Sequence, residues 1–132
     1  MKKTAHLLKH YPLTLLCLAL IFFLSLLIDV PESKLNDVTY IDKWTHFIMY
    51  GGTCSVMWWE YLRCHDRVEW WKLWLYAIIG MVVLGGVIEL LQAYCTAHRS
   101  GEWLDFVADS LGVALGAGVG LLLNKKMRKS AK

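Results

Sequence analysis

Four apolar stretches take up most of this 132-residue chain, and they constrain its fold more than any other feature. Each approaches the roughly 20 residues that a helix needs to cross the hydrocarbon of a bilayer. A water-soluble chain of this size would have too small an interior for its apolar surface, since 57% of its residues are hydrophobic. The sequence therefore predicts an all-α membrane protein. We expect one domain over residues 1–132, a compact bundle of four transmembrane helices at about 13–30, 43–63, 73–96 and 103–124.

Basic residues indicate the orientation of such a bundle, because cytoplasmic loops carry an excess of Lys and Arg. They cluster at the amino end, between the second and third helices and at the carboxyl end: Lys2, Lys3, Lys9, Arg63, Arg67, Lys72, Lys125, Lys126, Arg128, Lys129 and Lys132. We therefore expect both termini and the middle loop in the cytoplasm. These charges form no single basic face, so nucleic acid is not an expected partner.

Polar side chains interrupt the second and third apolar stretches at helical spacing. Asp42, His46 and Tyr50 are four residues apart, which places them on one face of the second helix. Glu89 and Gln92 lie one turn apart near the end of the third. We expect both stripes to face the interior of the bundle.

The fourth stretch carries a comparable stripe. Asp105 and Asp109 are four residues apart, and the same face continues into Gly112, Gly116 and Gly120. Small residues at this spacing let membrane helices approach closely. The ridge therefore predicts that both acids point into the bundle, and it also suits a homo-oligomer formed through these glycines.

In the expected topology all these polar residues lie in the extracytoplasmic half of the membrane. Ionisable groups there cost a few kcal/mol each, so they are functional candidates by default. Arg99, in the loop between the last two helices, can reach over Glu89 and Asp109. Several acids this close cannot all stay ionised and unpaired. Arg99 and Lys43 form ion pairs with them, or an acid is protonated, or a divalent cation is bound.

Three blocks of sequence resemble the VanZ-like family of membrane proteins. Residues 42–50 read DKWTHFIMY and resemble the family's Asp-Lys-x-x-His-Phe-x-x-Tyr signature. Residues 89–92, Arg99 and residues 105–112 are similar to its Glu-x-x-Gln, Arg and Asp-x-x-x-Asn-x-x-Gly blocks, in the same order. Asp109 departs from the pattern, because the family usually has Asn at this position.

This resemblance implies a multi-pass protein of a bacterial cytoplasmic (inner) membrane. The family's namesake is associated with resistance to the glycopeptide antibiotic teicoplanin, so an effect on glycopeptide susceptibility is the expectation it carries. The family name implies no reaction.

The leading hypothesis is a site that binds or processes a lipid headgroup or a lipid-linked cell-envelope precursor. His46 would be the general acid or base, because its pKa is ordinarily near neutral, with Asp42 orienting it and Glu89 assisting. The substrate-binding candidates are Arg99, Lys43, Gln92, Tyr50, Asp105 and Asp109. Glu89, Asp105 and Asp109 are also candidate ligands of a divalent cation, and such an oxygen-rich set suits Mg, Ca or Mn.

The competing hypothesis is a non-catalytic scaffold or regulator whose buried ion pairs fix the helix packing. A small transporter is less favoured, because Glu60 is the one acid available as a relay in the cytoplasmic half of the expected bundle.

Overall fold

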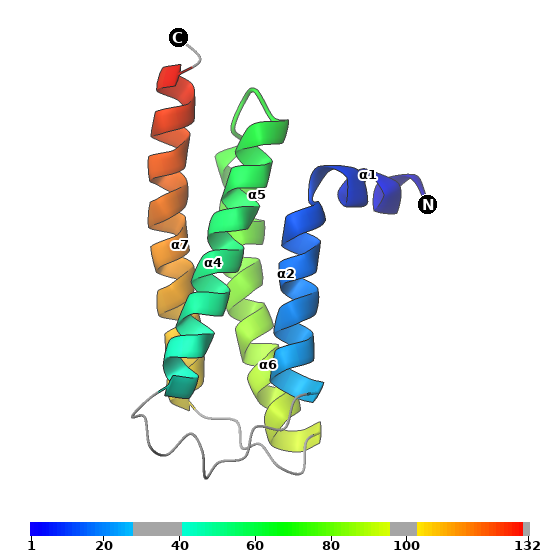
Figure 1. Ribbon diagram of the computed structural model, residues 1–132, viewed down its shortest axis with the longest axis vertical. Helices are drawn as coiled ribbons and strands as arrows, with labels where there is room; N and C mark the ends of the chain where they lie inside the picture. The colour runs from blue at the N-terminus through cyan, green and yellow to red at the C-terminus, as the bar shows by residue number, and fades with distance from the viewer. Residues whose placement is uncertain (28–40, 96–102, 131–132) are drawn as a thin grey trace.

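The computed structural model describes residues 1–27, 41–95 and 103–130, and the elements it describes are all helices (Figure 1). This confirms the predicted all-α class. In chain order the elements are α1 (Lys2–His10), α2 (Pro12–Phe22), the π-helical η1 (Phe23–Leu27), α4 (Ile41–Cys64), α5 (Trp70–Leu73), the π-helical η2 (Trp74–Gly80), α6 (Met81–Cys95) and α7 (Trp103–Ser130).

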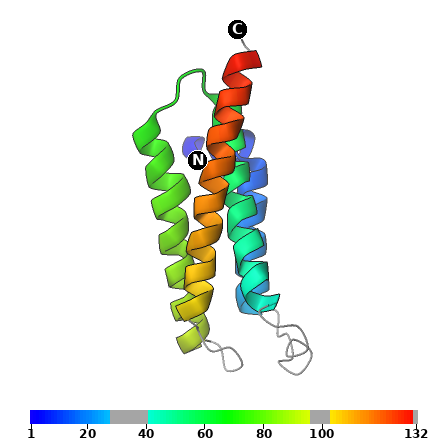
Figure 2. The same ribbon diagram turned by 90° about the vertical axis from the view of Figure 1, so that its left-hand side faces the viewer.

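These elements form four rods that run side by side, namely α2 with η1, α4, α5 with η2 and α6, and α7 (Figures 1 and 2). We call the end that holds both termini and residues 65–69 the terminal end. The other end, which holds Leu27, Ile41, Cys95 and Trp103, is called the opposite end.

Two of the rods are long and apolar enough to cross a membrane. They are residues Trp70–Cys95 and Trp103–Arg128, each 26 residues long. Residues Lys2–His10 and Pro12–Leu27 meet the same standard only as a pair, and the pair is bent by 93°. The described residues thus contain two helices that can span a bilayer, or three if the bent pair is one span.

The bend between α1 and α2 was not expected from the sequence. Pro12 occupies the first turn of α2, where its missing N–H costs nothing. The next two backbone N–H groups, of Leu13 and Thr14, donate to the Glu60 carboxylate, each over 2.9 Å. The Thr14 hydroxyl donates to it over 2.7 Å. Glu60 of α4 therefore satisfies the N–H groups that the start of a helix leaves without partners.

The glycine ridge of α7 packs against α4 of the same chain. A Cβ atom at Gly116 would lie 2.6 Å from the Cys54 Cβ, and one at Gly120 would overlap the Trp58 ring. Only a residue without a side chain allows this approach. The ridge thus joins α4 to α7, as a close-packing surface should, and a homo-oligomer through it stays a prediction.

Candidate functional site

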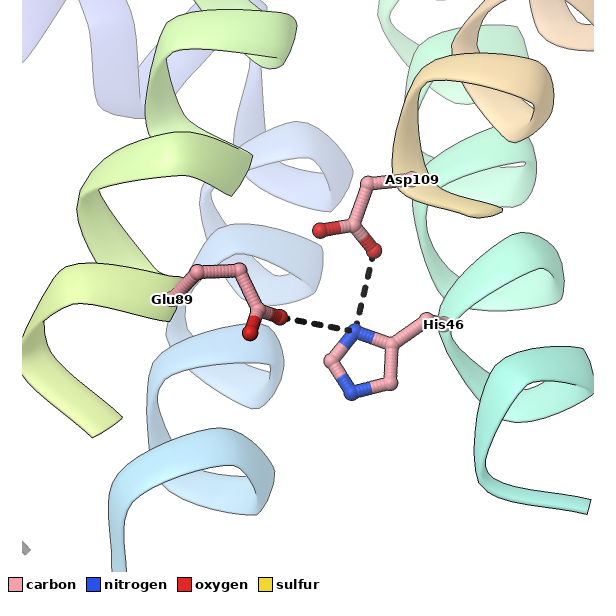
Figure 3. A group of neighbouring side chains, drawn as sticks. All are labelled: His46, Glu89 and Asp109. Atoms are coloured by element: carbon pink, nitrogen blue, oxygen red, sulfur yellow. Dashed lines mark hydrogen bonds and ion pairs between the residues drawn. The ribbon is translucent and has the colours of Figure 1, made fainter. Parts of the chain in front are cut away.

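Three helices bring His46, Glu89 and Asp109 together near the opposite end of the bundle (Figure 3). His46 lies five residues after the start of α4, Glu89 six residues before the end of α6, and Asp109 six residues after the start of α7. At a rise of about 1.5 Å per residue these positions have nearly the same depth. Their exposed fractions are 3%, 8% and 0%.

Both acids approach the same nitrogen of the His46 imidazole. Its Nδ1 is 2.9 Å from Asp109 Oδ1, a hydrogen-bond distance, and 3.9 Å from Glu89 Oε1 (Figure 3). A carboxylate at this distance fixes the tautomer and the orientation of the ring. An imidazole held in this way can act in proton transfer, and the same three groups can hold a cation.

Tyr50 forms the wall of the site one turn closer to the terminal end. Its ring is nearly parallel to that of His46, with the two centroids 6.4 Å apart. Tyr50 is fully buried, and its hydroxyl has no hydrogen-bond partner among the described residues. The phenol interacts electrostatically with Asp109 and Glu89. The site therefore includes a buried polar oxygen beside its two carboxylates.

Gly85 of α6 makes room for the Asp109 carboxylate. A Cβ at this position would lie 3.0 Å from Asp109 Oδ2 and 3.4 Å from a ring carbon of Tyr50. A larger residue would press on both side chains. The structure thus gives Gly85, which precedes Glu89 by one turn of α6, a place in the site.

A second polar layer lies one turn closer to the opposite end. Lys43 Nζ is 3.7 Å from Asp105 Oδ1, and the lysine side chain is 22% exposed. Gln92 Nε2 donates a 2.8 Å hydrogen bond to the Ser25 carbonyl oxygen, which ties α6 to η1. The Lys43–Asp105 contact thus places a partly exposed ammonium group one turn from the buried site.

The predicted site residues thus separate into three groups. His46, Glu89, Asp109 and Tyr50 share the buried site. Lys43, Asp105 and Gln92 make the contacts of the second layer. Asp42 and Arg99 lie outside the residues whose side chains the structure describes, so the roles predicted for them stay predictions.

The structure adds one contact and changes the composition of the candidate metal-binding group. The His46 ring contacts Asp109 of another helix, and the predicted contact with Asp42 lies outside the described side chains. The group that could hold a metal contains His46 with Glu89 and Asp109, whereas Asp105, the third ligand suggested before, lies beside Lys43. Spacing along one helix identified the residues, but the pairing between helices depends on rotations that spacing does not determine.

Comparisons with known proteins add no relative: no family model, no curated protein and no solved structure matches the chain.

Proposed function

We propose that the chain is a four-span protein of the bacterial cytoplasmic membrane, with both termini in the cytoplasm. In this proposal it binds or processes a lipid headgroup or a lipid-linked cell-envelope precursor at the extracytoplasmic face. The observation that supports it best is the buried group of His46, Glu89 and Asp109, which lies within two turns of the opposite end. The VanZ-like resemblance and an effect on glycopeptide susceptibility belong to the same proposal.

The depth of the site supports a headgroup as the ligand. The opposite end would lie among the extracytoplasmic headgroups, and Lys43 is partly exposed there beside Asp105. A lysine ammonium binds phosphate as a point charge. Lys43 precedes His46 by one turn of α4. The phosphate of an anionic headgroup that contacts Lys43 would therefore lie about one turn from the His46 ring.

His46 is the group best suited to chemistry on such a ligand. Asp109 orients its ring, as the third member of a catalytic triad orients a histidine. Glu89 adds a second carboxylate, 3.9 Å from the same ring nitrogen. This arrangement supports proton transfer at the extracytoplasmic face.

Two natural cysteines test the orientation. Cys95 is exposed at the opposite end, and Cys64 is half-buried at the terminal end. In whole cells, variants that keep one of these cysteines and lack the other three should react differently with a membrane-impermeant maleimide. We expect labelling of Cys95 in intact cells and labelling of Cys64 only after permeabilisation. The reverse pattern would refute the orientation.

Native mass spectrometry of the detergent-solubilised chain tests the ligand class. Phosphatidylglycerol, phosphatidylcholine and a polyprenyl phosphate are the probes. We expect the two anionic lipids to be retained in preference to phosphatidylcholine, and Lys43→Gln or His46→Gln to abolish this preference. Lys125→Gln, which removes an exposed charge at the terminal end, is the control. Equal retention of all three lipids by the unaltered chain would refute the proposal.

The second candidate function is a non-catalytic scaffold or regulator, which is favoured by the contacts of the second layer. The Lys43–Asp105 pair joins α4 to α7, and the Gln92–Ser25 hydrogen bond joins α6 to η1. Exchanging the pair, with Lys43→Asp and Asp105→Lys together, keeps the ion pair and moves the cation to α7. A scaffold would tolerate this exchange, whereas a headgroup site would lose its selectivity.

A further inference from the structure

We propose that His46, Glu89 and Asp109 are three ligands of one divalent transition-metal ion. This inference deepens the proposed function and rests on it only for the substrate on which the ion would act. The three residues come from α4, α6 and α7, so the ion would join three of the four rods (Figure 3).

The spacing of the ligand atoms fits one ion. One ligand atom of each residue lies within 4.8 Å of those of the other two. The His46 Nδ1 is 2.9 Å from Asp109 Oδ1 and 3.9 Å from Glu89 Oε1. Nitrogen and oxygen ligands bind zinc at about 2.0–2.2 Å, which places neighbouring ligand atoms roughly 3–3.5 Å apart. Small rotations of the Glu89 side chain would bring its oxygen to this distance.

Tyr50 is a second and independent indication of a ligand. Its side chain is completely buried, yet its hydroxyl has no hydrogen-bond partner among the described residues. A buried hydroxyl without a partner is unusual, because its desolvation costs free energy. The phenol interacts electrostatically with both acids. A metal-bound water beside Glu89 and Asp109 would give this hydroxyl an oxygen to donate to.

The donor set favours a particular class of metal. Mg and Ca prefer oxygen ligands alone, whereas imidazole suits Zn, Fe, Ni and Cu, and carboxylates also bind Mn. One imidazole with two carboxylates therefore fits Zn, Mn or Fe(II) better than the Mg or Ca that an all-carboxylate set would suit.

A metal titration must first exclude a competing histidine pair. His6 and His10 are four residues apart on α1, exposed or nearly so, with ring centroids 4.3 Å apart. Such pairs bind transition metals on helix surfaces. The experiment therefore uses a background chain with His6→Gln and His10→Gln, which leaves the buried site unchanged.

The test is a titration of this full-length background chain with Co(II) in detergent, after removal of metals with a chelator, followed by competition with Zn(II). The readouts are the visible absorption of bound Co(II) and calorimetry. We expect one ion per chain, and at least about tenfold weaker binding in each of His46→Gln, Glu89→Gln and Asp109→Asn. Glu69→Gln, which removes an exposed acid at the terminal end, is the control and should bind as the background does.

Three results would overturn the inference. The first is that the background chain binds no Co(II). The second is that binding is unchanged in His46→Gln and Asp109→Asn. The third is that the Glu69→Gln control loses as much affinity as the three ligand variants. Circular dichroism identifies any variant that does not fold. For such a case, X-ray absorption of the zinc-loaded background chain must show one imidazole with oxygen ligands, and sulfur ligands or several imidazoles would overturn the inference.

The same preparations separate this inference from the proposed function. Selective lipid retention without Co(II) binding would refute the metal site alone. Co(II) binding at the three residues without lipid selectivity would refute the headgroup proposal and leave the metal site supported.

Discussion

The two ends of the bundle both bury acidic side chains, but they give them different partners. At the terminal end the Glu60 carboxylate accepts two backbone N–H groups and one hydroxyl from the first turn of α2. Near the opposite end, Asp109 and Glu89 both approach one imidazole nitrogen of His46. Glu60 and Asp109 are equally buried, with exposed fractions of 0%.

This difference shows that burial alone does not identify a functional acid. The described partners of Glu60 are two backbone N–H groups and one hydroxyl of the first turn of α2, and none of these groups is an ordinary acid or base. Asp109 and Glu89 have a titratable partner and a second acid beside them. The type of partner therefore separates an acid that supports the fold from acids that can support chemistry.

The largest effect on stability is expected from Glu60→Ala. This change removes the acceptor of the Leu13 and Thr14 N–H groups and of the Thr14 hydroxyl. Hydrogen bonds to charged groups contribute roughly 1.5–3 kcal/mol each. We expect the free energy of unfolding in detergent to fall by about 3–5 kcal/mol, since the three bonds share one carboxylate. Denaturant titration followed by circular dichroism measures it.

Glu69→Ala is the matched control for that change. Glu69 pairs with Lys72 over 2.7 Å, but both side chains are more than 40% exposed. Exposed pairs contribute about 0–1 kcal/mol. Similar small losses in both variants would show that Glu60 is not a structural acid.

A smaller loss is expected from Gly112→Ala. The added Cβ would overlap the carbonyl oxygen of Phe47, the residue that follows His46, so α4 and α7 would have to separate beside the site. Overpacking of this kind costs about 1–3 kcal/mol. Thermal unfolding measures the loss, and Co(II) affinity should fall with it.

Gly118→Ala provides the comparison on the same helix. A Cβ at Gly118 would meet nothing within 4 Å, so this variant should be neutral or slightly more stable. If both alanines had the same effect, the close approach of α4 and α7 would be wrong.

Asp109→Asn should change stability less than Glu60→Ala or Gly112→Ala. The amide keeps the shape of the side chain and an oxygen that can accept the hydrogen bond from the His46 ring. We expect the free energy of unfolding without metal to change by about 1 kcal/mol or less. A loss as large as that of Glu60→Ala would place Asp109 with Glu60 as an acid that supports the fold.

The smallest effect concerns Tyr11, which lies between α1 and α2 at the terminal end. Burial is the main cause that raises the pKa of Tyr11 from 10.0 to about 12, and the nearby Cys64, Tyr61 and Glu60 contribute to the same shift. The folded chain therefore favours the neutral phenol. The resulting stability is present below pH 10 and is lost as the pH rises from 10 through about 12.

Tyr11→Phe removes this titration. Melting temperatures of the two chains should change in parallel below pH 10 and diverge above it, with the unaltered chain losing more. Parallel curves across the whole range would mean that Tyr11 titrates as it does in an unfolded chain.

Much of the fold could be predicted because its signals are local. Apolar runs of helical length indicated α4 and the rod of α5, η2 and α6 within about three residues of their bounds. They also indicated the start of α7, which continues six residues beyond the expected end at 124. The bend before α2 could not be predicted in this way. Pro12 indicated the start of a helix, but the direction of α1 depends on packing, and the contact that holds α2 joins Thr14 to Glu60, 46 residues away.

The candidate site was predictable to a similar extent. Four-residue spacing identified His46 and Asp109 as inward-facing, and the topology placed Glu89 at their depth. The spacing did not show that Asp109, and not Asp105, contacts His46. That choice depends on the rotation of α7 against α4. The close contacts of Gly112, Gly116 and Gly120 with α4 determine this rotation.

The origin of the three side chains in three successive rods has a consequence for biosynthesis. The ribosome delivers His46 first, Glu89 some forty residues later and Asp109 last. A nascent chain that ends before α7 has the imidazole but lacks the carboxylate that orients it. The site is therefore completed only when α7 docks against α4, and a chain stalled before α7 contains His46 and Glu89 without Asp109.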